Sequence, residues 1–455
     1  MSRWSENVVS YKDGGGGFIP LAGSAHIKIG YCTGLVVGGY KTIVQESDVD
    51  ELGSGPLVDA CLDTIQTRGG TIIALAAAAS VAGTATVITR TGTGLATTAN
   101  TGTPNGDYEV VVEIVKGGAL NEAQYRLSRD GGDSWDITKT VPVGGAVDTG
   151  TGITTTFTAA VAPAESFVLG DKFKFKTTPP QMSNADFLAA MDVVTSKPFS
   201  YEFIHVVGPT GSALWAVCGS EADLLEAEMV PIFFLCETRN IGATETVDAY
   251  VQALITERGV FTHRRVGVVA GRLEVADLLG RQRDTNMGAV VAGIISKSQP
   301  QESAGKVKSF NITQALAIKP DGFNMAHAKM LHEASFIVPR VYNQYPGIYV
   351  EEAILMSLPG SDFDAIKSRR VADRAAVAAY KAGMFFMKSE MYVDEMDNLK
   401  ANMEKPLGDM VTNGNILGYD LKLISAASEE IKWDLAVIEV ETMRVINTTV
   451  RLKRG

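Results

Sequence analysis

The segment that decides the fold is VPRVYNQYPGIYVEEAILMSLPGSDFDAIKSRRVADRAAVAAYKAG, residues 338–383, which joins an extended, aromatic stretch to a long helix. Ser361 is placed to cap that helix, and Asp362 and Asp364 suit its first turn, where the helix dipole favours negative charge. Residues spaced three to four positions apart then form one face of the helix. Its members are Phe363, Ile366, Arg370, Asp373, Val377 and Tyr380.

Arginines occupy positions on this helix where a core-facing helix normally has leucines. Arg369 and Asp373 form an i,i+4 pair, while Arg370 and Arg374 lie in or beside the apolar face. A buried guanidinium group needs a carboxylate or carbonyl partner, so we expect this face to meet another polypeptide that supplies one. The alternative is a solvated helix whose arginines extend their charged ends into water.

The same region resembles the C-terminal part of contractile phage tail sheath proteins. The resemblance lies in Tyr345-Pro-Gly-Ile-Tyr-Val-Glu-Glu and in SDFDAIKSRRVADRA, which begins at Ser361. In that family an Arg-containing turn and an extended segment precede a helix of the form W/F-x-x-I-x-x-R-R-x-x-D. The matching positions are Arg340, Phe363, Ile366, Arg369, Arg370 and Asp373, with Phe363 where the family usually has tryptophan.

Length and composition indicate a large globular protein. The 455 residues exceed one ordinary core, so two to four domains are expected. The formal net charge of −11 argues against nucleic-acid binding as the main role. Cys32, Cys61, Cys218 and Cys236 lack ligand spacing, which favours free thiols in a reducing compartment. The N-terminus has no apolar core of a secretion signal.

Residues 69–89 are uncharged and about long enough to span a bilayer. They are mostly Ala, Thr and Gly, however, and membrane insertion favours Leu, Ile and Phe. Two short strands with a turn near Gly83 are therefore expected, and no membrane insertion.

The chain begins with an extended arm at residues 1–18. Its strand-like residues are Asn7, Val8, Val9, Ser10 and Tyr11, and its hinge is Gly14, Gly15, Gly16 and Gly17. Residues 19–79 then predict a strand, a turn and a helix. Leu57, Cys61, Leu62 and Ile65 share one face of that helix, Pro56 suits its first turn and Gly69 ends it. This part also resembles the first region of the sheath family.

Residues 80–180 predict an inserted, β-rich outer domain. They are rich in Thr, Gly, Ala and Val, and they contain the alternating runs DYEVVVEIV, AQYRLS, ITTTFTA and KFKFKTT. A compact, sandwich-like fold is expected for this all-β domain. The resemblance places such insertions on the outside of the sheath.

Residues 181–337 complete a discontinuous α/β domain that starts at 19–79. FSYEFIHVVG, IFFLCET and RVGVVAG are short apolar runs typical of strands buried on both faces. Helices are expected around Glu221–Met229 and at Thr244–Arg258, the latter directing Val247, Tyr250, Val251 and Leu254 inward. The alternation of strands and helices predicts a mostly parallel sheet.

Residues 338–442 form the predicted C-terminal α+β assembly domain, and residues 443–455 a C-terminal strand arm. The arm has no later partner in the sequence, so it pairs either within its own sheet or with a neighbour. Together with the N-terminal arm, it predicts strand exchange between subunits. The expected C-terminal contacts are Val445, Asn447, Thr449, Val450 and Leu452. Frayed tails, or a sheet closed within one chain, remain the alternative.

Residues that could carry chemistry are few. Ser128-Arg-Asp130-Gly-Gly132-Asp-Ser134-Trp135 fits the Asp-box pattern, a turn device in which the Asp caps backbone N–H groups and the Trp packs beneath. Asp130, Asp133 and Asp136 lack the ligand pattern of a calcium loop. No Walker, GxSxG, HExxH or GxGxxG motif occurs. We therefore expect no catalytic residues, no metal and no cofactor.

The histidines also have structural interpretations. His327 and His332 are five apart and point to different faces of a helix, so they do not share a metal. His26 and His205 lie in apolar strands and are expected to be core histidines with satisfied hydrogen bonds.

The resemblance implies a structural subunit that polymerises as stacked hexameric rings around an inner tube and contracts to drive the tube through a cell envelope. Its implied partners are further copies of itself, the tail tube protein, the baseplate, and tail terminator or neck proteins, with no direct nucleic acid. It implies a place in the virion tail after assembly in the bacterial host cytoplasm. Charged contacts with a neighbour or the tube are expected at Arg340, Arg369, Arg370, Asp373 and Arg374.

Two other classes stay open from the sequence. One is an α/β carbohydrate-acting enzyme or binding protein with a β-sandwich insertion, which would function as a dispersed monomer. The other is a different virion assembly protein, such as a tube or capsid subunit, although a tube subunit would be smaller and dominated by β structure.

Overall fold

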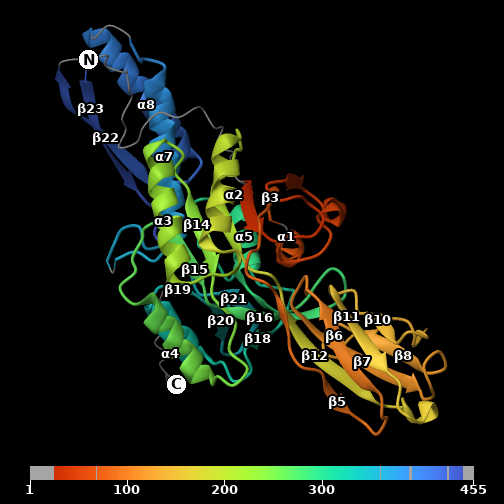
Figure 1. The fold of residues 1–455 in the computed structure, drawn as a ribbon. Coiled ribbons are helices and arrows are strands. Elements are labelled where there is room, and N and C mark those ends of the chain that lie inside the picture. Colours follow the sequence, from red (N-terminus) through yellow and green to blue (C-terminus); the bar gives the residue numbers. More distant parts are fainter. Residues whose placement is uncertain (1–24, 68, 359, 389–391, 428–429, 444–455) are drawn as a thin grey trace, which may run out of the picture.

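The computed structural model describes residues 25–67, 69–358, 360–388, 392–427 and 430–443. The molecule is elongated, with an α/β body between two outlying parts (Figure 1). A β-rich part lies at one end, and a helix with a two-stranded sheet lies at the other. The predicted mixed α/β character is confirmed.

A seven-stranded sheet forms the centre of the body, in the order β19-β15-β14-β13-β1-β3-β2. All of its pairings are parallel except that of β2 with β3. The strands are β1 His26–Gly30, β2 Tyr40–Ile43, β3 Ile72–Ala76, β13 Phe203–Pro209, β14 Phe233–Glu237, β15 Val266–Val269 and β19 Phe336–Ile337. Nearly all of the residues in the parallel strands are buried, which explains why their sequences are continuous apolar runs.

Helices cover both faces of this sheet. One face packs against α2 (Asn184–Ser196), α3 (Ser212–Ala227), α4 (Val247–Arg258) and α6 (Met325–Glu333). The other face packs against α1 (Pro56–Gln66) and α5 (Gly288–Lys297). The expected helices at residues 221–229 and 244–258 correspond to α3 and α4, although α3 begins earlier, at Ser212. Short 3-10 turns occur at η1 Glu46–Asp48, η2 Asp50–Leu52 and η3 Pro163–Glu165.

Between β3 and α2 the chain forms two antiparallel sheets with a core of their own. One contains β4, β5, β7, β8, β9 and β12, and the other contains β6, β10 and β11. Their bounds are β4 Thr84–Ala85, β5 Thr89–Thr91, β6 Thr97–Gly102, β7 Tyr108–Lys116, β8 Gln124–Ser128, β9 Lys139–Thr140, β10 Ala146–Asp148, β11 Ile153–Thr158 and β12 Lys172–Thr178. We refer to this part as the inserted β domain; it projects from the body in Figure 1.

The stretch at residues 69–89 contains the short strands β3 and β4, as predicted, but the two lie in different sheets and do not form a turn at Gly83. Among the residues that the structure describes, no helix has the length and apolar character needed to cross a membrane.

After the central sheet the chain builds a three-stranded sheet and a hairpin. The sheet has β16 (Arg272–Ala276) between β17 (Gln282–Asn286) and β18 (Ala315–Lys319). The hairpin pairs β20 (Pro339–Tyr342) with β21 (Tyr345–Val350). Helix α7 (Ile366–Met384) then leads away from the body to α8 (Val393–Thr412) and to the antiparallel pair β22 (Gly418–Ala427) and β23 (Glu430–Ile438).

Candidate assembly site: the buried junction of helix α7

Helix α7 is attached to the body at its first residue. Ala365 is extended (φ −105°, ψ 143°) and bridges to Ile354, and the Ile366 N–H donates to the carbonyl of Ala353. Ser361 does not cap the helix, contrary to the prediction. Its hydroxyl accepts the N–H of Phe363 in a preceding turn (3.2 Å), and α7 begins only at Ile366 because residues 353–354 hold Ala365 in an extended conformation.

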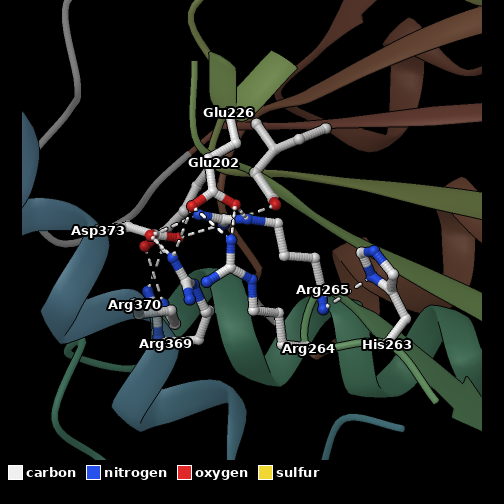
Figure 2. Close-up of polar contacts among 9 residues, drawn as sticks. Glu202, Glu226, His263, Arg264, Arg265, Arg369, Arg370 and Asp373 are labelled. Atoms are coloured by element: carbon white, nitrogen blue, oxygen red, sulfur yellow. Dashed lines mark hydrogen bonds and ion pairs between the residues drawn. The ribbon is translucent and has the colours of Figure 1, made fainter. Parts of the chain in front are cut away.

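Asp373 of α7 is shared between two buried arginines (Figure 2). Arg265, just before β15, donates from Nη1 to Oδ2 at 2.8 Å and from Nη2 to Oδ1 at 3.0 Å. Arg369 donates from Nη2 and Nε to Oδ1 at 2.6 and 3.0 Å. Arg265 is 0% exposed and also donates to the carbonyl of Ile232, so its guanidinium lies wholly inside the protein.

Glu226 extends this cluster to helix α3. It accepts from Arg265 Nε and from Arg264 Nη2, the latter at 3.0 and 3.1 Å to its two oxygens. The Arg369 side chain also packs over the ring of Phe363, 4.6 Å from the ring centroid. The cluster therefore connects α3, the start of β15 and α7.

Glu202, which directly precedes β13, forms a second ion pair with α7. Arg370 contacts both of its carboxylate oxygens, Nε to Oε1 at 2.9 Å and Nη2 to Oε2 at 3.0 Å. Arg370 Nη1 donates to the Ser298 hydroxyl at the end of α5 (2.9 Å), and Arg374 approaches Glu202 at 3.4 Å. We call these residues, with Arg264, Arg265, Glu226, Arg369 and Asp373, the α7 junction.

The charged groups of the α7 junction are largely removed from water, and they form close ion pairs with one another. Burial alone would lower the pKa of Arg265, but the charge of Asp373 and the hydrogen bonds to Glu226 and Asp373 raise it overall. For Arg374 burial outweighs the attraction of Glu202, and the pKa is lowered. Removing one member of a buried pair typically costs about 3–5 kcal/mol, because the other charge is left uncompensated. The junction is therefore a fixed attachment between α7 and the body.

These contacts correct the prediction for four of the five candidate interface residues. The partners of Arg369, Arg370, Asp373 and Arg374 lie in this chain, not on another polypeptide. Arg369 and Arg370 are each 2% exposed, which also excludes the solvated-helix interpretation. The predicted i,i+4 pair of Arg369 with Asp373 is present. For Arg370 and Arg374 the requirement for a carboxylate was correct, but its source was assigned wrongly.

Sequence reasoning missed Glu202, Glu226 and Arg265. Glu202 and Arg265 each stand immediately before a buried apolar strand. A charged residue that directly precedes a buried strand needs a partner of opposite charge, so the sequence did indicate that Glu202 and Arg265 form buried pairs. No spacing rule connects these residues with α7, however, because Arg370 and Glu202 are 168 positions apart.

Arg340 differs from the other four candidates. It lies on the β20–β21 hairpin, opposite Tyr349, and stacks over Tyr342 at 5.2 Å from the ring centroid. Its Nε is 3.3 Å from a carboxylate oxygen of Glu351, and its side chain is 38% exposed. Part of this guanidinium is thus available to a neighbour, and its role in a charged interface stays a prediction.

A buried polar chain crosses the central sheet, which the sequence did not reveal. Lys28 Nζ lies 2.8 Å from His205 Nδ1, and His205 Nε2 lies 2.9 Å from Glu237 Oε1. The Gly208 N–H donates to the other oxygen of Glu237 at 3.0 Å. Burial lowers the pKa of Lys28 to about 8 and raises the pKa of Glu237 to about 7.

The predicted core histidines have different outcomes. His205 is satisfied by this chain of contacts, as expected. His26 is buried and stacks on Phe203 at 4.7 Å, but neither ring nitrogen has a hydrogen-bond partner, so the prediction is wrong for His26. His327 pairs with Asp248 at 2.8 Å.

The Asp-box in the inserted β domain is a turn, as predicted. Asp130 accepts the Ser134 N–H at 2.9 Å and the Ser128 hydroxyl at 2.7 Å. Trp135 packs against the guanidinium of Arg126, 4.1 Å from its ring centroid. Asp136 is paired with Arg129, and within the described ranges no three His, Cys, Asp or Glu residues gather as metal ligands would.

The crevice where α/β proteins commonly bind ligands is filled by the chain itself. β1 and β13 are neighbours whose connections leave to opposite sides, which defines that crevice at their carboxyl ends. Residues 179–182, which follow the inserted β domain, line it together with Tyr31, Pro56, Val207 and Leu214. The space left is about 10 Å³, enough for about one water molecule.

Both predicted arms lie largely outside the described residues. These are Asn7, Val8, Val9, Ser10, Tyr11 and the hinge Gly14–Gly17 at one end, and Val445, Asn447, Thr449, Val450 and Leu452 at the other. Their roles therefore stay predictions.

Comparisons with known proteins agree with this architecture. A putative tail sheath protein of Haemophilus phage HP1 (strain HP1c1) is 28% identical over 195 residues, which are 39% of this chain and 47% of that protein. The matched segment thus spans about half the length of this curated relative. The family model described as DUF2586, N-terminal domain, matches residues 6–353.

Two solved sheath structures share the fold over almost the whole chain. The helical sheath of the anti-feeding prophage (AFP) in the contracted state covers 98% of this chain and 98% of its own, with a TM-score of 0.56 and 12% identity. The PVC sheath complex of an extracellular contractile injection system, also contracted, covers 99% and 98%, with a TM-score of 0.55 and 9% identity. The chain belongs to the DUF2586 family, and its fold is that of contractile sheath proteins.

Proposed function

We propose that this protein is the structural, non-catalytic subunit of a contractile tail sheath. It polymerises as stacked hexameric rings around an inner tube and contracts to drive the tube through a cell envelope. The observation that carries the proposal is the fold shared with two contracted sheaths over at least 98% of the chain. The related phage protein, itself described as a putative tail sheath protein, supports it.

Strand exchange between subunits is the proposed means of holding neighbours together. β22 and β23 form a two-stranded sheet, and no third strand pairs with it among the described residues. Leu421, Trp433 and Leu435 pack it against α8, and neither of its edges is paired with another strand within the described part of the chain. Such edges accept an extended segment from another chain. The arms at residues 1–18 and 443–455 are the segments that would be donated.

The distribution of charge supports the C-terminal arm as the segment that pairs with the β22–β23 sheet of a neighbour. Residues 392–443 contain eleven acidic and four basic side chains. The last twelve residues, 444–455, contain four basic side chains (Arg444, Arg451, Lys453 and Arg454) and no acidic one. A basic arm is attracted to the acidic α8–β22–β23 unit of a neighbour, and this attraction weakens as salt is added.

The mechanism that follows is mechanical. The sheath assembles in an extended, metastable form on the tube and baseplate, and it is closed by terminator or neck proteins. It then changes to a shorter, wider form with more contacts, while the exchanged arms keep neighbours tethered. Gly14–Gly17 would act as the hinge of the N-terminal arm, and Arg340 as a charged contact. Assembly would take place in the bacterial host cytoplasm, and the product would be part of the virion tail.

Electron microscopy of the purified protein at increasing concentration tests this proposal. Hollow, striated tubes or rings are expected. Dispersed monomers at all concentrations, with turnover or binding of a carbohydrate, would support an α/β enzyme or binding protein instead. Deletion of residues 1–12 or of 443–455 is expected to abolish polymerisation and leave the fold intact. Normal tubes from both truncations would contradict strand exchange.

A further inference from the structure

The neck of the inserted β domain, which we define as residues 80–85 and 178–183, contains an unusual concentration of bonds on one oxygen. Asp186 Oδ2 accepts the N–H and the hydroxyl of Ser80 at 2.9 and 2.6 Å. It also accepts the N–H and the hydroxyl of Ser183 at 2.9 Å each. Ser80 leads into the inserted domain, Ser183 follows it, and Asp186 belongs to α2 of the body. One carboxylate thus joins the segment that enters the inserted domain to the N-terminal cap of α2 in the α/β body.

Backbone pairing continues from this point into the inserted domain. Val81 and Gln181 exchange both N–H···O=C hydrogen bonds, at 3.1 and 2.9 Å. Further along, Thr84 and Thr178 are paired in β4 and β12, and their hydroxyls lie 2.8 Å apart. The two segments of the neck are therefore hydrogen-bonded to each other in an antiparallel arrangement, next to the contact with Asp186. The neck is not a flexible linker.

Close packing leaves little freedom around the ladder. A Cβ placed on Gly83 would lie 2.5 Å from the carbonyl oxygen of Thr178, so the two crossings are in direct contact. Residues 179–182 fill the crevice beside Tyr31 and Val207 of the body. A lateral contact, Asn105 Nδ2 to the Ser54 hydroxyl at 2.9 Å, joins the base of the inserted domain to the segment before α1.

The charge state of Asp186 fits this role. Burial alone would raise its pKa, but the bonds from Ser80 and Ser183 lower it to about 2. The carboxylate is therefore ionised throughout the range in which the protein is expected to function, and charge-assisted hydrogen bonds are stronger than neutral ones.

We propose that Asp186 is a clamp that holds the inserted β domain in one orientation on the α/β body, so that the two move as a single unit. This inference concerns the single subunit and does not depend on the proposed assembly. Its consequence is that any surface presented by the inserted domain follows the body without swinging on its neck.

Distances between two spin labels test the clamp directly. The four native cysteines are buried, so labels react selectively at Val143→Cys in the inserted domain and Val260→Cys in the body, which are 76% and 96% exposed. The labelled full-length chain, diluted with unlabelled chain, is expected to give one narrow distance distribution by electron paramagnetic resonance. Asp186→Ala is expected to at least double its width. Ser80→Ala removes the hydroxyl bond and keeps the N–H bond to Asp186, so it is expected to widen the distribution less.

Ser183→Ala is the matched control, because it removes a bond to the same carboxylate from within the α2 cap and leaves the tie to Ser80. Its distribution should keep the width of the parent protein. A broad distribution in the parent protein would overturn the proposal without any variant. So would unchanged widths in both Ser80→Ala and Asp186→Ala. Should Asp186→Ala fail to fold, Ser80→Ala decides alone, because it keeps the hydrogen bonds between Ser183 and Asp186 that cap the start of α2.

Discussion

Arg370 and Glu202, 168 residues apart in the sequence, form a bidentate ion pair at 2.9 and 3.0 Å inside the protein. The pair joins helix α7 to the residue that leads into β13. Because Arg265 and Asp373 form a second buried pair beside it, the C-terminal part is attached to the body by two largely buried ion pairs. The arginines of helix α7 thus connect two parts of the same subunit.

Glu202→Gln is expected to lower the free energy of unfolding by about 3–5 kcal/mol, since Arg370 would be left as an unpaired buried charge. Urea denaturation measures this change. The control is Glu333→Gln, which breaks a pair with Lys329 whose side chains are 73% and 65% exposed; it should cost about 1 kcal/mol or less. Equal effects of the two substitutions would contradict a buried, fixed junction.

Glu237→Gln should alter how stability depends on pH. Burial raises the pKa of Glu237 from 4.5 to about 7, so the folded state holds a proton that the unfolded state releases. The stability from this group is fully present below pH 4.5 and is lost as the pH rises to about 7. The glutamine in the variant does not titrate, so this pH-dependent loss is absent from it. Between pH 5 and pH 8, the free energy of unfolding of the variant should therefore rise relative to that of the parent protein by up to about 3 kcal/mol. Urea denaturation at both pH values measures it; a constant difference would contradict the prediction.

Gly288→Ala should destabilise the α/β body. The new Cβ would lie 2.5 Å from Glu237 Oε1 and 2.8 Å from His205 Nε2, at the start of the buried helix α5. Overpacking of this kind costs about 1–3 kcal/mol. Gly408→Ala in α8 meets nothing within 4 Å and should stabilise by about 0.5–1 kcal/mol. Thermal unfolding of both variants would show shifts of opposite sign.

Asp130→Ala should loosen the hairpin turn of the inserted β domain, at a cost of about 1–2 kcal/mol, because it removes the acceptor of the Ser134 N–H. Amide hydrogen exchange of residues 128–135 should become faster. Asp133→Ala, at an exposed position of the same turn, should leave exchange unchanged. Loss of a catalytic or calcium-dependent activity in either variant would contradict a purely structural turn.

Arg340→Ala should weaken polymerisation more than folding. The side chain is partly exposed, and its contact with Glu351 is long, so the melting temperature should change little. The concentration needed for tubes or rings should rise several-fold by light scattering. Lys329→Ala, an exposed cation on α6, is the control. If both variants polymerise like the parent protein, Arg340 has no interface role.

Local patterns in the sequence were sufficient for the main strands of the central sheet and of the inserted β domain. The apolar runs that became β13, β14 and β15 are buried on both faces of a parallel sheet, and the alternating runs of the inserted β domain became β7, β8, β11 and β12. These predictions succeeded because burial on one or two faces imposes its own periodicity on a strand. The start of α7 failed because the chain at residues 353–354, not a capping side chain, holds Ala365 extended.

By itself, the sequence determined that Arg369 and Arg370 need carboxylates, because a guanidinium on an apolar helix face cannot be buried alone. The i,i+4 spacing already paired Arg369 with Asp373, whereas only the tertiary structure decided that Glu202 supplies the carboxylate for Arg370. It likewise aligned Lys28, His205 and Glu237, which lie on three strands and share no sequence spacing. The physical reason is that a buried charge needs a partner wherever it lies, and this need can be read from the neighbouring sequence. Which residue serves as a distant partner depends on how segments far apart in the chain pack together.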